Sequence, residues 1–491
     1  MFGELFVGKQ LIYQVKRVRI NRRIVLGKKK ETEMNDNTNF TEGKIIGPLM
    51  RFAMPVMFAL FLQAMYGAVD LFVVGKFATS EDVSAVVTGS QIMMTLGNLV
   101  TSLAMGATIY LGQQIGMGNA KKGGAIIGAS IALFATMGAI MAVSIPILAS
   151  GIADIMKAPE DAFSQTVDYI TICGAGMIAI VAYNLIGAIF RSMGDSKTPL
   201  ITVAIACVFN IGGDMLLIAG FGLGAKGAAI ATVAAQLLSV SCSLFIIKRK
   251  KYPFEFNMKM IRFDGEIIGR VVKLGIPIAL QDFLVGLSFL VLQAIVNSLG
   301  VIASAGVGVS QRVCGFIMLV PLAFMQSISA FVAQNVGAGK MDRAYKALKS
   351  TVAVSFFFGI AMFALSFFKG DMLTGIFAKE DEVILAGAEY LKAYAIDCLL
   401  TCFLFCFIGF YNGRGETAFV MIQGLIGAFA VRIPVSLVMS KWEPVSLFHI
   451  GLATPCSTLV QIIMCFGFLA YLSKRKPKNK LIPERKQLTD N

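Results

Sequence analysis

Five charged residues lie well inside long apolar stretches of this sequence. They are four acids and one base: Asp70, Asp214, Asp282, Asp397 and Arg432. A carboxylate inside a membrane span is costly, so it usually faces the interior of the helix bundle or a water-filled cavity and marks an ion or proton pathway. The chemistry that such residues support is the reversible binding of a proton or another small cation within a membrane.

Two of these acids have polar neighbours at helical spacing. Asn210 precedes Asp214 by one helical turn, and Gln63, Tyr66 and Asp70 share one helix face. Two acids brought together in a low-dielectric cavity would not both stay ionised, so one would take up a proton or a cation would neutralise the pair. We therefore predict a proton or sodium switch at Asp70 and Asp214. The alternative is that either acid caps a neighbouring backbone or lies at a membrane interface.

Pro55 lies in the same apolar stretch as Asp70. A proline removes one helical hydrogen bond and permits a bend. A bend in this helix would couple neutralisation of Asp70 to the shape of the cavity. The alternative is that Pro55 only begins the helix, where proline is tolerated.

The elements that position these residues are predicted to be membrane helices. The 491 residues are 56% hydrophobic and only 15% charged, whereas soluble chains average about 25% charged. Long runs in lipid must be helices, because strands of a closed barrel are much shorter. The prediction is an all-α polytopic membrane protein with twelve transmembrane helices, at about 50–75, 88–112, 123–149, 166–190, 198–220, 226–247, 267–299, 307–335, 347–368, 385–411, 416–440 and 447–472.

The basic residues predict how the chain is oriented. The formal net charge of +15 comes from Lys and Arg in alternate loops and in both tails, which is typical of cytoplasmic loops and argues against nucleic-acid binding. We predict a multi-pass protein of the cell inner (plasma) membrane with both termini in the cytoplasm. Residues 1–47 are the basic N-terminal segment and 473–491 the basic tail. Residues 1–33 would be a basic segment on the membrane surface, or the native chain would begin at Met34, which we prefer.

The two halves of the chain contain similar sequence motifs at a constant displacement. The charged linker 248–266 separates an N-lobe, residues 48–247, from a C-lobe, residues 267–472. The motif QQIGMG at 113–118 resembles QNVGAG at 334–339, and Gly-Asp-Ser at 194–196 resembles Gly-Glu-Thr at 415–417. We predict two pseudo-symmetric six-helix lobes with the substrate site near their interface.

The sequence lacks the residue patterns that a disulfide framework, a metal site or an enzyme active site would need. The nine cysteines lie in apolar segments, so neither a disulfide framework nor a structural metal is expected. The shared face of Cys398, Cys402 and Cys406 favours packing over a soft-metal site. His449 is the single histidine and is expected at an interface. With neither an HExxH motif nor a P-loop, we predict that the protein is not an enzyme and uses no cofactor besides a coupling ion, H⁺ or Na⁺.

Several motifs resemble the multidrug and toxic compound extrusion (MATE) family of transporters. The first is P-x7-Q-x6-D at Pro55, Gln63 and Asp70. The second is N-x3-D at Asn210 and Asp214, followed by GLG-x2-GAAIAT at 222–232. The loops QQIGMGNAKK and FRSMGDSKTP also fit, and the resemblance covers about residues 40–475.

The resemblance implies a V-shaped pair of lobes that exports organic cations in exchange for H⁺ or Na⁺. It implies a cation site in the N-lobe at the positions of Asp70, Asn210, Asp214 and Thr232. It also implies that Gln63 and Tyr66 line the adjoining cavity and that Pro55 bends the helix.

The sequence departs from one branch of the family, which places sodium-binding acids in spans seven and ten. Asp282 and Asp397 lie in those spans, but nearly one turn early. They would line the substrate cavity as a second acidic patch, or Asp397 would pair with Arg432.

The leading hypothesis is a monomeric antiporter for cationic, amphipathic drugs in the lipid bilayer. The alternative is a lipid-linked oligosaccharide flippase of the same superfamily, although its anionic carrier would call for basic residues in the cavity.

Overall fold

The computed structural model describes residues 40–250 and 254–474, and the described chain is helical throughout. Eleven continuous helical stretches of the described chain are long and apolar enough to cross a membrane. A pair of helices joined at a bend forms one more candidate span, which brings the number to twelve. The fold class predicted from the sequence is thereby confirmed. Nearly all of the predicted basic tail and most of the predicted N-terminal segment lie outside the described residues.

The first half of the chain contains the predicted spans one to six. Its elements are α2 (Ile46–Phe77), α3 (Ser80–Gly116), α4 (Ala120–Ile155), η1 (Glu160–Ala162), α5 (Phe163–Ala175), α6 (Met177–Ser192), α7 (Lys197–Asp214), the π-helix η2 (Met215–Gly220) and α8 (Gly224–Arg249).

The second half follows the short helix η3 (Met258–Met260). Its elements are α9 (Gly265–Asn297), α10 (Val301–Ile317), α11 (Leu319–Gly337), α12 (Met341–Phe368), α13 (Gly370–Gly375), α14 (Asp381–Arg414), α15 (Thr417–Leu425), the π-helix η4 (Ile426–Arg432), α16 (Ile433–Met439), α17 (Leu447–Gly451) and α18 (Ala453–Lys474).

The predicted span 166–190 is not one straight helix. It breaks between α5 and α6, which are inclined at 50°. The break lies at Gly176, where a Cβ atom would overlap the side chain of Val233 on α8. Glycine therefore lets α8 approach the backbone at the point where the span changes direction.

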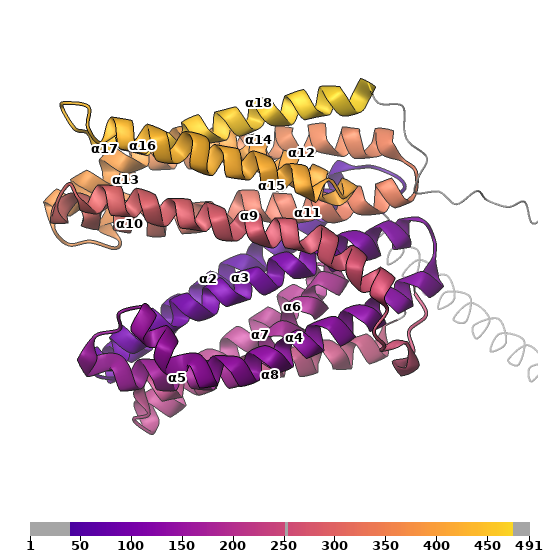
Figure 1. The fold of residues 1–491 in the computed structure, drawn as a ribbon, viewed down its shortest axis with the longest axis horizontal. Coiled ribbons are helices and arrows are strands. Elements are labelled where there is room, and N and C mark those ends of the chain that lie inside the picture. Colours follow the sequence, from indigo (N-terminus) through magenta and orange to yellow (C-terminus); the bar gives the residue numbers. More distant parts are fainter. Residues whose placement is uncertain (1–39, 251–253, 475–491) are drawn as a thin grey trace, which may run out of the picture.

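The two halves form two groups of helices that come together toward the end of the molecule where α9 begins (Figure 1). The first helix of each half packs against the opposite half at that end. Leu49 and Phe52 of α2 share a buried cluster with Phe331 of α11. Val271 and Leu274 of α9 share one with the helices of the first half. Each lobe thus packs the apolar face of its first helix into the buried core of the other lobe.

Glycines bring the lobes into backbone contact at the same end. A Cβ atom on Gly116 would overlap the carbonyl oxygen of Gln334, and one on Gly337 would overlap that of Gln113. Both glycines come from the repeated Gln-x2-Gly motifs at the ends of α3 and α11. The sequence repeat therefore marks the point where the two lobes cross.

Candidate functional site

The two acids of the first half converge inside it. Asp70 on α2 and Asp214 at the end of α7 are both buried, at 6% and 0% exposure. The side chains of Asp214, Asn210 and Thr232 surround the carboxyl group of Asp70. The hydroxyl of Thr232 on α8 donates to Asp70 Oδ2 over 3.4 Å. The structure therefore brings together the four residues that the family resemblance implies for one cation site.

This cluster is rich in unsatisfied oxygen atoms. Asp70 Oδ1, both carboxyl oxygens of Asp214 and both polar atoms of the Asn210 side chain are buried without a hydrogen bond from the described residues. Burying such groups without a partner is costly. Two carboxyl groups can share a hydrogen bond only when one of them carries a proton. A shared proton or a small bound cation would satisfy these oxygen atoms.

A small cavity adjoins the cluster. Gln63, Tyr66, Tyr183, Asn210 and Gln236 supply its polar lining. Gln63 Nε2 donates to the Tyr183 hydroxyl over 2.5 Å, and Gln236 Nε2 donates to the Tyr66 hydroxyl over 3.4 Å. The cavity volume is about 10 Å³, which is room for about one water molecule. In this state the N-lobe cavity accommodates an ion or a water, and not a drug-sized molecule.

Sequence reasoning missed Tyr183, which closes this cavity from α6. Its hydroxyl accepts the hydrogen bond of Gln63 on α2. The polar pair Tyr183 and Asn184 interrupts an otherwise apolar stretch, and that interruption is the signal that would have found it.

A π-helical stretch occurs in the fifth predicted span of each half, although the two stretches are not at equivalent positions of the repeat. The stretch η2 follows Asp214 directly, and η4 ends at Arg432. Such bulges are rare and frequently occur at functional sites. Residue patterns do not reveal them, because a π-helix needs no special composition.

Pro55 lies well inside α2 and not at its start, since the helix begins at Ile46. The alternative in which the proline merely begins the helix is therefore wrong. The helix continues past Pro55 to Asp70 without interruption. Pro55 thus removes one hydrogen bond from the helix that carries an acid of the cluster.

The acids of the second half have different partners. Asp282 on α9 is exposed and accepts a hydrogen bond of 2.5 Å from Ser102 on α3 of the opposite lobe. Asp397 on α14 is buried, close to the Thr458 hydroxyl and in the field of Arg432. The arrangement thus places Asp282 between the lobes, and it favours the Asp397–Arg432 interaction over a shared acidic patch.

Arg432 is itself held in place. Its guanidinium donates to Ser288 Oγ over 2.8 Å and lies 4.1 Å from the centre of the Phe289 ring. A cation over an aromatic face is stabilised by the ring quadrupole. Arg432 is therefore engaged from α9 as well as from the side of Asp397.

The repeat shows what corresponds to the cluster in the second half. A displacement of 222 residues relates Pro55 to Pro277, and the same displacement relates Asn210 to Arg432. It relates the two acids Asp70 and Asp214 to the uncharged positions Leu292 and Ser436. The second half thus has a base in place of Asn210 and uncharged residues in place of the two acids.

The family model MatE matches residues 55–216 and again 277–438. Among curated proteins, the probable multidrug resistance protein YpnP of Bacillus subtilis (strain 168) is 27% identical over 448 residues, which cover 91% of this chain and 99% of the relative. The probable multidrug resistance protein YoeA of the same organism is 25% identical, covering 88% of this chain and 95% of the relative.

The fold also matches solved structures. One of them, described as the outward-facing conformation of a multidrug resistance MATE family transporter of the MOP superfamily, superposes with a TM-score of 0.83 at 17% identity. The match covers 89% of this chain and 99% of that structure. The two matches to the family model MatE are displaced by 222 residues and together cover most of the chain. The chain is therefore a multi-pass membrane protein that belongs to the MatE family of transporters.

Proposed function

We propose that this protein is a secondary antiporter that exports cationic, amphipathic drugs or other organic cations from the cell in exchange for H⁺ or Na⁺. The observation that carries the proposal is the buried cluster of Asp70 and Asp214, whose unsatisfied oxygens lie beside a cavity of one-water size. The names of the two Bacillus relatives, both multidrug resistance proteins, support the class of substrate.

The cluster acts as the switch. Without a bound ion, the paired acids give the N-lobe a negative interior that favours a cationic substrate in the space between the lobes. When a proton or Na⁺ neutralises Asp70 and Asp214, that attraction is lost. Since Pro55 weakens the helix that carries Asp70, the change at the cluster is passed on as a bend of α2.

The proposed orientation indicates to which side of the membrane the substrate cavity opens. Both termini and the basic loops belong to the cytoplasm by the positive-inside rule, so the end where the lobes are joined is the cytoplasmic end. The structure then corresponds to a state closed toward the cytoplasm. In this state Asp282, which bonds to Ser102 across the lobes, is available to an organic cation from the opposite side.

A flippase for an anionic lipid-linked oligosaccharide fits the geometry less well. Such a carrier would need free basic groups inside the protein. Arg432, the one base well inside the predicted spans, is already engaged by Ser288 and Phe289 and lies in the field of Asp397. The charge of Arg432 is therefore partly engaged within the protein, whereas Asp70 Oδ1 and both carboxyl oxygens of Asp214 have no hydrogen bond from the described residues.

The test is efflux of a cationic dye from proteoliposomes, with a pH gradient and a sodium gradient imposed separately. We expect one gradient to drive efflux in the absence of the other, which also identifies the coupling ion. If neither gradient drives the exchange of organic cations by purified protein in sealed vesicles, the proposal is wrong.

A further inference from the structure

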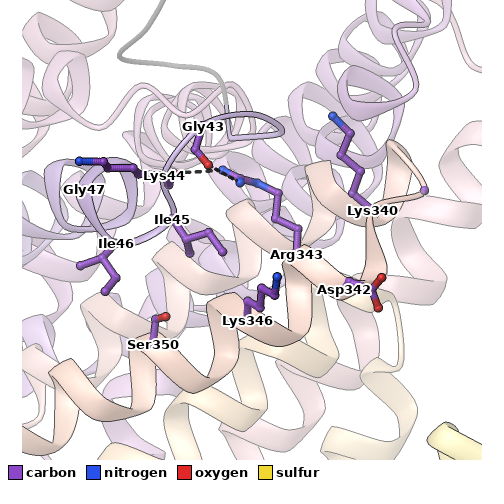
Figure 2. Close-up of a pocket in the computed structure, with 11 residues that line it drawn as sticks. Gly43, Lys44, Ile45, Ile46, Gly47, Lys340, Asp342, Arg343, Lys346 and Ser350 are labelled. Atoms are coloured by element: carbon purple, nitrogen blue, oxygen red, sulfur yellow. Dashed lines mark hydrogen bonds between the residues drawn. The ribbon is translucent and has the colours of Figure 1, made fainter.

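A groove of about 800 Å³ opens where the start of α2 meets the start of α12 (Figure 2). Its walls are residues 43–47 of the first half and, from the second half, Gly339, Lys340, Asp342, Arg343, Lys346 and Ser350. The lining carries Lys44, Lys340, Arg343 and Lys346 against a single acid, Asp342. This volume is in the range of small-molecule sites, roughly 300–1,000 Å³, and its formal charge is strongly positive.

The groove is built by hydrogen bonds and does not depend on loose surface side chains for its shape. Arg343 donates to the carbonyl oxygens of Phe40, Glu42, Gly43 and Lys44 over 2.6–3.1 Å. Figure 2 shows this reach from α12 to the chain at Gly43. The ring of Phe40 is buried beneath it against Phe52 and Phe331. Arg343 thus fixes the wall of the groove and leaves little donor capacity for a ligand.

Lys44 and Lys346 are the cations left for a ligand. Both side chains are exposed, and neither takes part in the ion pairs found among the described residues, which are Lys226–Asp168 and Lys250–Asp195. The starts of α2 and α12 border the same groove, and neither helix has a side-chain cap. Uncapped helix N-termini add backbone N–H donors to the positive field. The groove therefore combines two exposed lysines with the positive N-terminal ends of two helices.

The position of the groove indicates the kind of anion. Ser350, which lines its inner end, lies more than two turns along α12 from Met341, so the groove runs from the water-exposed end of the helix toward the apolar span. Ile46 adds an exposed apolar side chain to the wall. A ligand that fills this groove presents an anionic group to the lysines and an apolar portion to the membrane side.

We propose that this groove binds the phosphate headgroup of an anionic phospholipid of the cytoplasmic leaflet, with Lys44 and Lys346 as its contacts. Basic pockets between helices on the cytoplasmic side suit such headgroups. The side of the membrane rests on the orientation proposed above. Because the groove joins the first helix of the N-lobe to α12 of the C-lobe, the bound lipid ties the two lobes together.

The test is lipid retention by the purified full-length protein, measured by native mass spectrometry after exposure to equal amounts of phosphatidylglycerol and phosphatidylethanolamine. We expect the wild type to retain phosphatidylglycerol preferentially. The double variant Lys44→Gln, Lys346→Gln loses affinity for it by roughly 25-fold, at about fivefold per lysine. The measurement requires no transport, so its result is separate from that of the dye-efflux test.

The matched control is Lys121→Gln, Lys122→Gln, which removes two charges from the corresponding loop of the first half, at the start of α4. This variant should retain phosphatidylglycerol as the wild type does. Equal losses in the two double variants, or no preference for phosphatidylglycerol in the wild type, would overturn the proposal. Displacement of the lipid by an equimolar amount of inorganic phosphate would also overturn it, because the site would then serve a soluble anion.

Discussion

Gln113 and Gln334 bind the two lobes together in the same way, each from its own side. Gln334 Nε2 donates to the carbonyl oxygen of Ser192 over 2.7 Å, and Gln113 Nε2 donates to that of Gly413 over 3.2 Å. The donors are 221 positions apart in the sequence, and so are the acceptors. The repeated motif therefore makes the same contact between the lobes two times, at positions related by the pseudo-twofold axis of the transporter.

This closure predicts that Gly116→Ala disrupts the joined end of the lobes. The added methyl group would overlap the backbone oxygen of Gln334, which cannot turn aside as a flexible side chain would. Overpacking of this kind costs about 1–3 kcal/mol, so we expect dye efflux to fall by roughly 5- to 150-fold. A spin-label distance across the joined end, from a label on α3 to one on α11, should increase.

Gly97→Ala is the matched control for that variant. Gly97 is also on α3, but a methyl group there would meet nothing within 4 Å. This variant should transport and close as the wild type does. Unchanged distances and efflux in Gly116→Ala would show that the glycine crossing does not hold the lobes.

The cluster of acids predicts that Asp214→Asn abolishes exchange while the protein remains folded. The amide has nearly the shape of the carboxyl group but cannot take up a proton or balance the charge of Na⁺. Transport by the variant in proteoliposomes should fall to background under either gradient, and its elution profile on size exclusion should not change. The control Asp168→Asn removes an acid whose side chain is exposed and paired with Lys226, and it should retain transport. Coupled transport by Asp214→Asn would remove Asp214 from the switch.

Sequence patterns predicted the helices and the family because both leave a strong periodic signal. The long apolar runs give the spans, and the constant displacement between motifs gives the two halves. Both predictions are confirmed by the all-helical fold and by the two matches of the family model. The spacing of Asn210 and Asp214 also indicated which helix face they share, and this is a local property of the chain.

The partners of these residues were harder to predict, because periodicity says which face a side chain occupies and not which helix it meets. Tyr183 lies 120 positions from Gln63, and Ser102 lies 180 positions from Asp282. The contact between lobes at Ser102 depends on how closely α3 and α9 approach, which follows from the glycines between them. A Cβ atom on Gly106 would overlap the backbone of α9, and nothing in the local pattern of Gly106 distinguishes it from a lipid-facing glycine.

The hydroxyl of Thr232 predicts a smaller effect on ion binding than the acids do. Thr232→Val removes the donor to Asp70 and keeps the shape of the side chain. The bond is long, at 3.4 Å, so we expect a loss of about 1 kcal/mol, or about a fivefold weaker apparent affinity for the coupling ion. Thr232→Ser retains the hydroxyl and should recover most of that affinity. The measurement is the dependence of dye efflux on the concentration of the coupling ion, and equal affinities in the valine and serine variants would contradict a role for the hydroxyl.

The last prediction concerns Asp195, which lies in the loop before α7. Burial opposes its charge, but hydrogen bonds from the Lys250 ammonium and from Thr198 outweigh that effect, and the pKa of Asp195 is lowered. Lys250 Nζ lies 2.7 Å from Asp195 Oδ2, and the Thr198 hydroxyl lies 2.6 Å from the same oxygen. These contacts tie the end of α8 to the start of α7, the helix that carries Asp214.

A lowered pKa in the folded state means that the ionised carboxylate stabilises the fold. The contribution is fully present above the pKa of an unfolded aspartate, about 3.9, and it is lost as the pH falls through the folded value. Since Lys250 is partly exposed, solvent screening limits the contribution to about 1 kcal/mol. We expect Asp195→Asn to lower the apparent melting temperature in detergent at pH 7, and we expect this deficit to shrink as the pH falls below about 3.9. The exposed Asp161→Asn should follow the wild type at every pH, and a deficit of Asp195→Asn that persists unchanged into acid would show that the charge of Asp195 is not what stabilises this loop.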